Sequence, residues 1–259
     1  MKKAEAADKA LIIEILSRSF ENNQSVNYIV KQDSSRINAI RALMDYSFEM
    51  CSLFGDVWLS DNHQACALVL YPQNKRATFK AILLDVKLII KAIGLLGIKK
   101  TLNRESKIKA KQPKEPMAYL WFIGVEPNQQ HKGLGSKLLQ EITNDATAKQ
   151  LPVYLETSTI KNLPWYERFG FIVYSRLELS YNLFFLNARP TFNFYHVSIR
   201  HAGTHRYLYF YFTGSEYVGF SGRPLFFAAP RTQPVIISAT AFFDAILQYH
   251  WWPVPGPVN

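Results

Sequence analysis

Apolar residues in the first third of the chain recur at intervals of three and four, the spacing of one face of an α-helix. The first run comprises Leu11, Ile12, Ile15, Leu16 and Phe20. It predicts a helix over 8–20. A second run begins after the capping residues 33–35 and continues to about Phe54, where Gly55 ends it. A third and more apolar helix is predicted over 77–96, either as a core helix or as a lid over an acceptor pocket.

Runs of β-branched and aromatic residues bounded by turn residues predict six strands. They are expected at 57–60, 65–71, 119–125, 152–157, 171–179 and 181–186. The first two are separated by Asp61-Asn62-His63, which is turn chemistry and predicts a hairpin. Helices are expected between the later strands, at about 134–149 and 162–169. This succession of elements predicts a mixed α/β domain with the connections of an α+β sheet.

The composition changes sharply near residue 189. All eighteen lysines lie at or before Lys161, whereas 190–259 holds seventeen of the aromatic residues and only six charged ones. We therefore expect one domain over 1–189 and an aromatic-rich C-terminal appendage over 190–259. Two interpretations of the appendage stay open. It is either a small β-rich unit of unknown role, or a poorly ordered segment that is not native coding sequence, such as a fusion or a shifted reading frame.

Charges within the most apolar stretches argue against membrane targeting. Glu5 and Asp8 interrupt the apolar run that a signal peptide needs soon after its basic start. Asp85 and Lys87 lie inside the longest apolar stretch, 81–98, and make a membrane span unfavourable. The chain is therefore expected in the cytoplasm, with no membrane partner.

The formal net charge of +10 fits either nucleic acid or a polyanionic small molecule as a partner. The lysine-rich segment 99–114 is predicted to be a solvated helix face or loop, or a binding patch. It lacks the interleaved aromatic residues of a nucleic-acid-binding segment, so no nucleic-acid partner is expected. Cys51 and Cys66 lie in apolar surroundings without metal-ligand spacing, which predicts buried thiols in a reducing compartment and no metal site.

The segment 121–139 carries the most informative chemistry, because it contains a strand, a glycine-bearing loop and the start of a helix. The first turn of a helix has unpaired N–H groups and the positive end of the helix dipole. Gly133 and Gly135 allow the backbone to approach a ligand closely. A phosphate or diphosphate is the natural occupant, although a glycine-rich loop without a ligand has the same local pattern.

Two motifs in this chain resemble those of the GNAT acetyltransferases. Gln130, Gly133 and Gly135 match the family's Gln/Arg-x-x-Gly-x-Gly/Ala pattern after a central strand. About thirty residues later, the segment 162–171, which reads NLPWYERFGF, is similar to the family's second motif. The resemblance covers 1 to about 189 and does not extend into the appendage.

The resemblance implies the GNAT fold. In that fold a central mixed, mostly antiparallel sheet is splayed at its middle strands and has helices on both faces. It also implies that acetyl-CoA is the acyl donor, with its pantetheine arm between the strands at 119–125 and 152–157. Its diphosphate would then lie on the amides of 130–136. The implied donor-binding residues are Ile123, Gly124, Val125, Gln130, His131, Lys132, Gly133, Leu134, Gly135, Ser136 and Asn162.

The implied reaction is direct attack of a primary amine on the thioester. An alkyl amine is mostly protonated at pH 7, which costs roughly 4 kcal/mol to reverse. Tyr166 matches the family tyrosine that often reprotonates the leaving sulfur, although a packing role is the alternative. Glu126 and Glu156 are the candidate bases, each acting through water. Glu156 is equally well interpreted as a structural or substrate-contacting group.

Two other functions stay open from the residues alone. A non-catalytic module that binds acyl-CoA or nucleic acid would account for the basic charge. A dinucleotide-binding oxidoreductase would account for Gly133 and Gly135 before a helix with Glu156 about twenty residues on. It lacks the third glycine, since Leu138 stands there, and its first glycine falls too far from the strand end. The amine acceptor, a small molecule or a peptide, is not specified, and a homodimer remains open.

Overall fold

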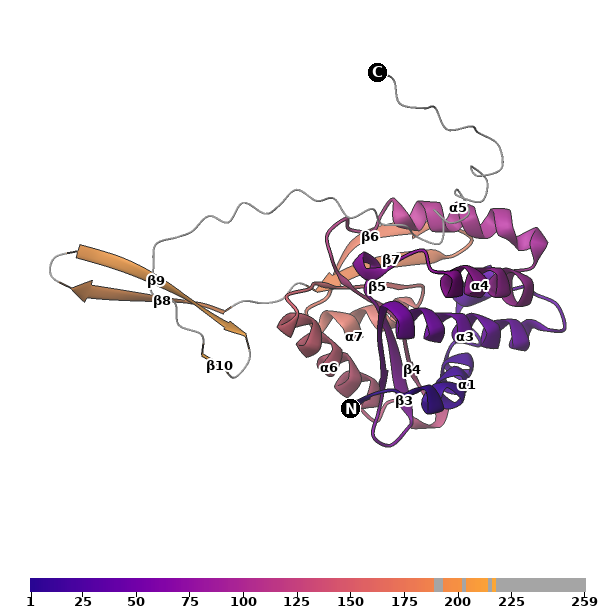
Figure 1. Ribbon diagram of the computed structural model, residues 1–259, viewed down its shortest axis with the longest axis horizontal. Helices are drawn as coiled ribbons and strands as arrows, with labels where there is room; N and C mark the ends of the chain where they lie inside the picture. The colour runs from indigo at the N-terminus through magenta and orange to yellow at the C-terminus, as the bar shows by residue number, and fades with distance from the viewer. Residues whose placement is uncertain (189–192, 202–203, 214–215, 218–259) are drawn as a thin grey trace, which may run out of the picture.

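The computed structural model describes residues 1–188 and the strands at 193–201, 204–213 and 216–217. A seven-stranded sheet with the order β1-β2-β3-β4-β5-β7-β6 forms its centre (Figure 1). Its strands are β1 (Lys2–Lys3), β2 (Gly55–Leu59), β3 (Ala65–Leu70), β4 (Ala118–Val125), β5 (Val153–Thr157), β6 (Ile172–Glu178) and β7 (Asn182–Ala188). All neighbouring strands are antiparallel except β4 and β5. The predicted mixed, mostly antiparallel sheet is therefore confirmed.

Helices cover both faces of this sheet, because successive side chains of a strand point to opposite faces and every residue of β3 is apolar and buried. The helices are α1 (Lys9–Ser19), α2 (Gln24–Ile29), α3 (Arg36–Phe54), α4 (Phe79–Leu88), α5 (Ile98–Lys109), α6 (Leu134–Ala148) and α7 (Leu163–Glu167). Figure 1 shows α1 and α3 on one side of β3 and β4, with α6 on the other. Each face buries its own apolar cluster.

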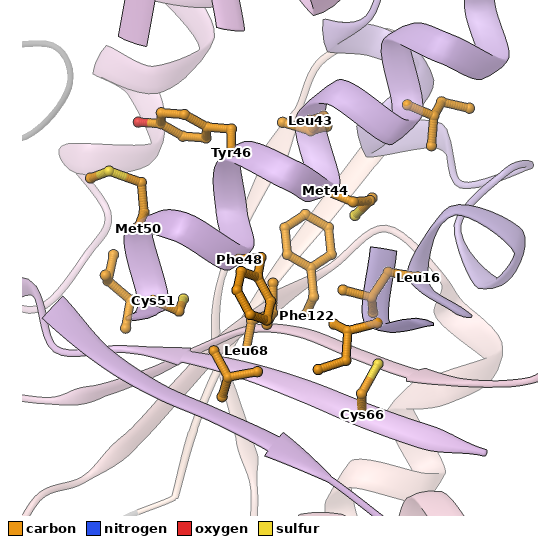
Figure 2. Packing of buried hydrophobic residues seen from close by; sticks show 14 of the residues in the cluster. Leu16, Leu43, Met44, Tyr46, Phe48, Met50, Cys51, Cys66, Leu68 and Phe122 are labelled. Atoms are coloured by element: carbon orange, nitrogen blue, oxygen red, sulfur yellow. The ribbon is translucent and has the colours of Figure 1, made fainter. Parts of the chain in front are cut away.

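The larger cluster lies between α3, α1 and the sheet. Figure 2 shows Phe48 of α3 directed at Leu68 and Phe122 on the strands below it. The amphipathic patterns of 8–20 and 33–54 therefore predicted the correct buried faces. Helix α1 also approaches β4 closely at Gly124, where a Cβ atom would lie 2.8 Å from the side chain of Leu16. This close approach fixes the height of α1 above β4.

The second cluster places α6 on the opposite face. Leu138, Leu139 and Ile142 of α6 are buried against the strands together with Leu120 and Leu155. Because these contacts lie close behind the start of α6, they anchor the first turn of that helix. The loop between β4 and α6 is thus held at both of its ends.

Strands β4 and β5 separate soon after they meet. They pair only through Ala118–Leu120 and Val153–Leu155, whereas β4 continues to Val125. Beyond Leu155, β5 pairs with β7 alone. The splay expected at the middle strands is therefore present, and it opens toward the loop that precedes α6.

The apolar segment predicted as a helix over 77–96 contains a change of helical geometry. Thr78 caps α4 by accepting a hydrogen bond from the amide of Ala81, and after Leu88 the chain widens into a π-helical turn, Ile89–Ile93. Gly94, with φ of +74°, ends it. One face of this segment is buried, as expected of a core helix. The other exposes large apolar side chains, namely Phe79, Leu83, Val86 and Ile90.

Several features were not expected from the sequence. Neither the short helix α2 nor the short strand β1 was predicted, and β7 is inserted between β5 and β6. The lysine-rich segment forms α5. Most of this helix is solvated, as the interpretation of the segment as a solvated helix face predicted, but Arg104 within it is buried. In the described part of the chain, no helix is long and apolar enough to cross a membrane.

Part of the expected appendage forms a separate antiparallel sheet. It consists of β8 (Asn193–His201), β9 (Thr204–Thr213) and β10 (Glu216–Tyr217). The remainder, including 218–259, lies outside the described residues, so the boundary near 189 stays a prediction. Cys51 and Cys66 are both free and buried, as expected, and burial raises the pKa of each thiol.

We predict that Phe48→Ala lowers the free energy of unfolding by about 3–5 kcal/mol, because it leaves a cavity between α3 and the sheet. The matched control is Phe79→Ala, whose ring is 77% exposed against 4% for Phe48. The control should change stability by no more than about 0.5 kcal/mol. Chemical denaturation of both variants measures the difference, and equal losses would contradict this description of the core.

Candidate active site

A cavity of about 1060 Å³ runs from the loop before α6 to the inner side of α5. Its walls come from α1, α2, α3, α4, β4, β5, α5 and α7, so it lies where the two middle strands part. A cavity of this size, whose wall contains both apolar side chains and many polar ones, has the character of a ligand site.

The backbone of β4 presents polar groups to this cavity. The amide of Glu126 donates to the carbonyl of Gln64 at 2.8 Å, next to the β3–β4 ladder. Because antiparallel ladders use alternate residues, the main-chain groups of Ile123 and Val125 face the side from which β5 has departed. The Val125 carbonyl accepts a hydrogen bond from the Ser19 hydroxyl at 2.9 Å. The backbone of Ile123 remains directed into the gap where β4 and β5 part, which we call the fork.

The loop from β4 to α6 forms an open cradle of amides. Two of its residues, His131 and Gly133, have left-handed φ values of +63° and +80°. Helix α6 then begins at Leu134, and no side chain in the described part of the chain caps it. Trp165 of α7 donates from Nε1 to the Ser136 hydroxyl oxygen at 3.0 Å, which leaves the Ser136 proton available to a ligand. The arrangement suits a diphosphate.

Nine of the eleven predicted donor-binding residues line the cavity, namely Ile123, Gly124, Val125, Gln130, His131, Gly133, Gly135, Ser136 and Asn162. The side chains of the other two do not. Lys132 donates to Gln129, and Leu134 packs into the apolar cluster under α6. Two cations that the sequence did not single out, Lys161 and Arg168, also line this end of the cavity. Positive charge is thus concentrated where phosphates would lie.

Tyr166 lines the cavity from α7 and is buried between aromatic neighbours. Its ring lies 4.7 Å from that of Trp165 and 5.7 Å from that of Phe171. Among the described residues its hydroxyl has no hydrogen-bond partner. It is not a fully enclosed atom either, because the enclosed polar atoms without a partner in this part of the chain belong to Ser17 and Trp58. The hydroxyl is therefore accessible from the cavity that Tyr166 lines. Burial raises the pKa of Tyr166, which keeps the phenol protonated at neutral pH.

Glu156 is the first residue of β5 beyond its pairing with β4, and its side chain lies in the cavity wall. Its Oε1 accepts hydrogen bonds from Tyr154 at 2.7 Å and from Gln112 at 3.1 Å. Oε2 has no such partner among the described residues and faces the cavity. Burial raises the pKa of Glu156, and the nearby charge of Arg104 opposes the rise.

Glu126, the other carboxylate predicted as a base, is not brought to the cavity. Its Oε1 lies 2.7 Å from Arg18 of α1, and it is not among the residues that line the cavity wall. The structure therefore separates two carboxylates that the sequence could not distinguish. Only Glu156 shares the cavity with Tyr166.

Several polar residues of the cavity were missed at the sequence level. Arg104 lies in a lysine-rich run, where a buried cation has no distinguishing pattern, yet it contacts Glu105, Tyr181 and Ser25. Gln112 follows the same run in a loop. No signal in the sequence indicates that it reaches a carboxylate forty-four positions away.

A splayed sheet, a helix start that opens onto the cavity, and a tyrosine and a carboxylate that line the same cavity are the features that the resemblance to the GNAT acetyltransferases implies. Residues 75–171 match the model of the acetyltransferase (GNAT) family. This segment of the chain therefore matches a GNAT acetyltransferase domain. An uncharacterized N-acetyltransferase of Schizosaccharomyces pombe is 40% identical over 62 residues. That match covers 24% of this chain and only 25% of the relative.

Solved structures extend the likeness to the whole described domain. A histone acetyltransferase HPA2 and related acetyltransferase of Corynebacterium glutamicum superposes with a TM-score of 0.53 at 18% identity, covering 73% of this chain and 95% of that one. Arylalkylamine N-acetyltransferase 2 of Aedes aegypti gives 0.53 at 13% identity, covering 73% and 98%. The C-terminal condensation domain of Ebony gives 0.55 at 10% identity, covering 73% and 97%. Identities this low show a shared fold alone.

We predict that Tyr154→Phe raises the pKa of Glu156, because it removes a 2.7 Å hydrogen bond that stabilises the charged carboxylate. NMR titration of the Glu156 carboxyl carbon measures the change without any assay of activity. Tyr71→Phe is the matched control, since its hydroxyl bonds to Asp56 away from the cavity. An unchanged Glu156 pKa in Tyr154→Phe would show that this bond does not hold the carboxylate.

Proposed function

We propose that this protein transfers an acetyl group from acetyl-CoA to a primary amine. The observation that carries the proposal is the convergence on one cavity of an uncapped amide cradle, a strand fork, and the pair Tyr166 and Glu156. Membership of residues 75–171 in the GNAT family supports acyl transfer. The donor and the acceptor are inferences from the site.

The residues present fit acetyl-CoA at the donor end. The amides of Gly133 to Ser136 and the hydroxyl of Ser136 would hold the diphosphate, with Lys161 and Arg168 balancing its charge. The pantetheine arm would extend along β4 and hydrogen-bond to the main chain of Ile123 and Val125. The thioester would then lie at the fork, in the cavity that Tyr166 and Glu156 both line.

Glu156 would prepare the amine. A bound ammonium group gives one proton to Oε2, the oxygen left without a partner, while Tyr154 and Gln112 keep Oε1 in place. A raised pKa makes Glu156 a stronger base than an ordinary carboxylate, because the proton is transferred to a group with higher affinity for it. Activity should therefore fall as the pH drops through the raised pKa of Glu156.

Tyr166 would complete the reaction on the sulfur. The neutral nitrogen attacks the thioester carbon, so that a C–N bond forms and the C–S bond breaks. The nitrogen then loses its second proton to water, and Tyr166 donates its phenolic proton to the thiolate. The phenolate recovers a proton from water, and Glu156 releases its own there, so the cycle closes with one net proton released.

The site does not favour the two other functions. A dinucleotide fold needs its first glycine at the strand end, whereas the 3-10 turn Pro127–Gln129 separates Val125 from Gly133. A non-catalytic acyl-CoA module accounts for the cradle and the fork. It gives no role to a buried phenol and a carboxylate that face one cavity.

We predict that coenzyme A and acetyl-CoA raise the melting temperature of the protein, whereas NAD and duplex DNA do not, because only a ligand that binds the native state stabilises it. Acetyl-CoA with a panel of primary amines should in addition release free thiol, measured with a thiol reagent. Stabilisation by coenzyme A without thiol release from any amine would support the non-catalytic module. Stabilisation by NAD alone would overturn the proposal.

We predict that Tyr166→Phe lowers kcat by about 10²-fold or more, because it removes the proton donor and keeps the packing of the ring. The Kd for acetyl-CoA should stay within about twofold, since no donor contact is assigned to this hydroxyl. Tyr71→Phe serves as the control for a buried tyrosine hydroxyl elsewhere. A Tyr166→Phe enzyme at full rate would remove Tyr166 from the mechanism.

A further inference from the structure

The cavity continues well past the fork into a region that acetyl-CoA does not need. We call this region the acceptor lobe and define it by the lining residues Leu43, Tyr46, Lys75, Asp85, Leu88 and Ile93. Its position follows from Gln73, whose side chain accepts a hydrogen bond from the amide of Met117, just before β4 begins. The amide cradle comes after the end of the same strand. The lobe also reaches the middle of β4, where the ring of Tyr46 lies 6.0 Å from that of Trp121, so the lobe and the cradle lie along different parts of the strand.

The charged residues on this side of the cavity fall into two groups. Arg104 and Glu105 form an ion pair, and Arg104 also contacts Tyr181 and Ser25. Lys109 and Glu115 likewise have partners. Each of these residues therefore already has an interaction within the protein.

Lys75 differs from them. It lines the lobe and is partly buried, and among the described residues its ammonium group has neither a hydrogen bond nor an ion pair. Asp85 and Glu105 are close enough to act on it electrostatically but do not contact it, and burial lowers its pKa. A partly buried cation that faces a cavity without a partner favours an anion at this point.

Asp85 provides the opposite charge nearby. Its Oδ1 accepts a hydrogen bond from Tyr46 at 2.7 Å. Its Oδ2 has no partner in the described part of the chain and is not a fully enclosed atom, so it is open to the lobe. The lobe thus offers a cation and a carboxylate oxygen that do not satisfy each other, and apolar side chains from α3, α4 and the π-helical turn surround them.

A third unsatisfied group lies toward the fork. Oε2 of Glu156 faces the same cavity, and the stacked rings of Tyr119 and Trp121, 6.2 Å apart, line the wall nearby. A ligand that satisfied all three groups would have an anion at Lys75, a cation at Asp85 and a second amine at Glu156. An apolar spacer would have to connect the charged head to that amine.

We propose that the acceptor is an amino acid with a second primary amine on an apolar side chain. Its zwitterionic head binds between Lys75 and Asp85, and its side-chain amine reaches Glu156. This inference rests on the proposed function, because it names the amine that the acetyl group would join. A simple diamine fits less well, since it would place a cation beside Lys75 and leave that residue unpaired.

The test compares each diamino acid with the diamine that lacks its carboxylate, namely lysine with cadaverine and ornithine with putrescine. Thiol release from acetyl-CoA gives kcat and KM for each. At least one diamino acid should have a kcat/KM about tenfold or more above its diamine. Lys75→Met should raise KM for that diamino acid by about ten- to a hundredfold and change kcat little, because a charge-assisted hydrogen bond to the head is lost. KM for the diamine should stay the same or fall.

Two further variants sharpen the test. Asp85→Asn keeps the shape of the side chain and should raise KM for the diamino acid but not for a monoamine of equal length. Lys91→Met changes an exposed lysine outside this cavity and should leave every constant unchanged.

Equal use of diamino acids and diamines by the native enzyme, or no effect of Lys75→Met, would overturn the inference and leave the proposed function intact. Absence of thiol release from every amine would instead count against the proposed function. In that case, thermal stabilisation by the diamino acid in the presence of coenzyme A, and its loss in Lys75→Met, would still decide whether the head site exists.

Discussion

The separation of β4 from β5 is the constraint on which the site depends. The two strands share only three residue pairs, after which β4 continues alone to Val125. Parallel pairing would otherwise consume the main-chain groups of Ile123 and Val125, and no extended ligand arm could enter. The apolar clusters on the two faces hold the parted strand in place, α1 from one side and α6 from the other.

The same parting explains why a carboxylate lies at the fork. Glu156 lies where β5 has lost one neighbour but still has the other, so its side chain lies between packed protein and the cavity. Tyr154 and Gln112 orient one oxygen, and the other has no partner among the described residues. Farther along the cavity, Lys75 and Oδ2 of Asp85 also have no hydrogen-bond partner in the described part of the chain, and the proposed acceptor would supply one to each.

Local patterns in the sequence predicted those parts of the fold that depend on local physics. Amphipathic spacing located α1, α3 and α6, and the glycine-bearing loop with its second motif was enough to indicate the GNAT family, which the family match confirms. The insertion of β7 beside β5 could not be predicted, because strand order depends on pairings between distant segments. Local pattern also could not separate Glu126 from Glu156. Glu126 follows one strand and Glu156 lies within the next, and the tertiary contact of Arg18 with Glu126 distinguishes them.

The π-helical turn at Ile89–Ile93 fixes the rotational phase of everything before it in α4. A π-turn closes with an i→i+5 hydrogen bond in place of the i→i+4 bond of an α-helix, so it holds about one more residue than an α-turn while the helix before it keeps nearly the same rotational phase. A residue gained or lost within this turn would therefore leave Asp85 in the cavity wall and the row that contains Leu83 outside it. A residue gained or lost between Asp85 and the turn would instead rotate Asp85 about the helix axis by about 100° and remove it from the wall.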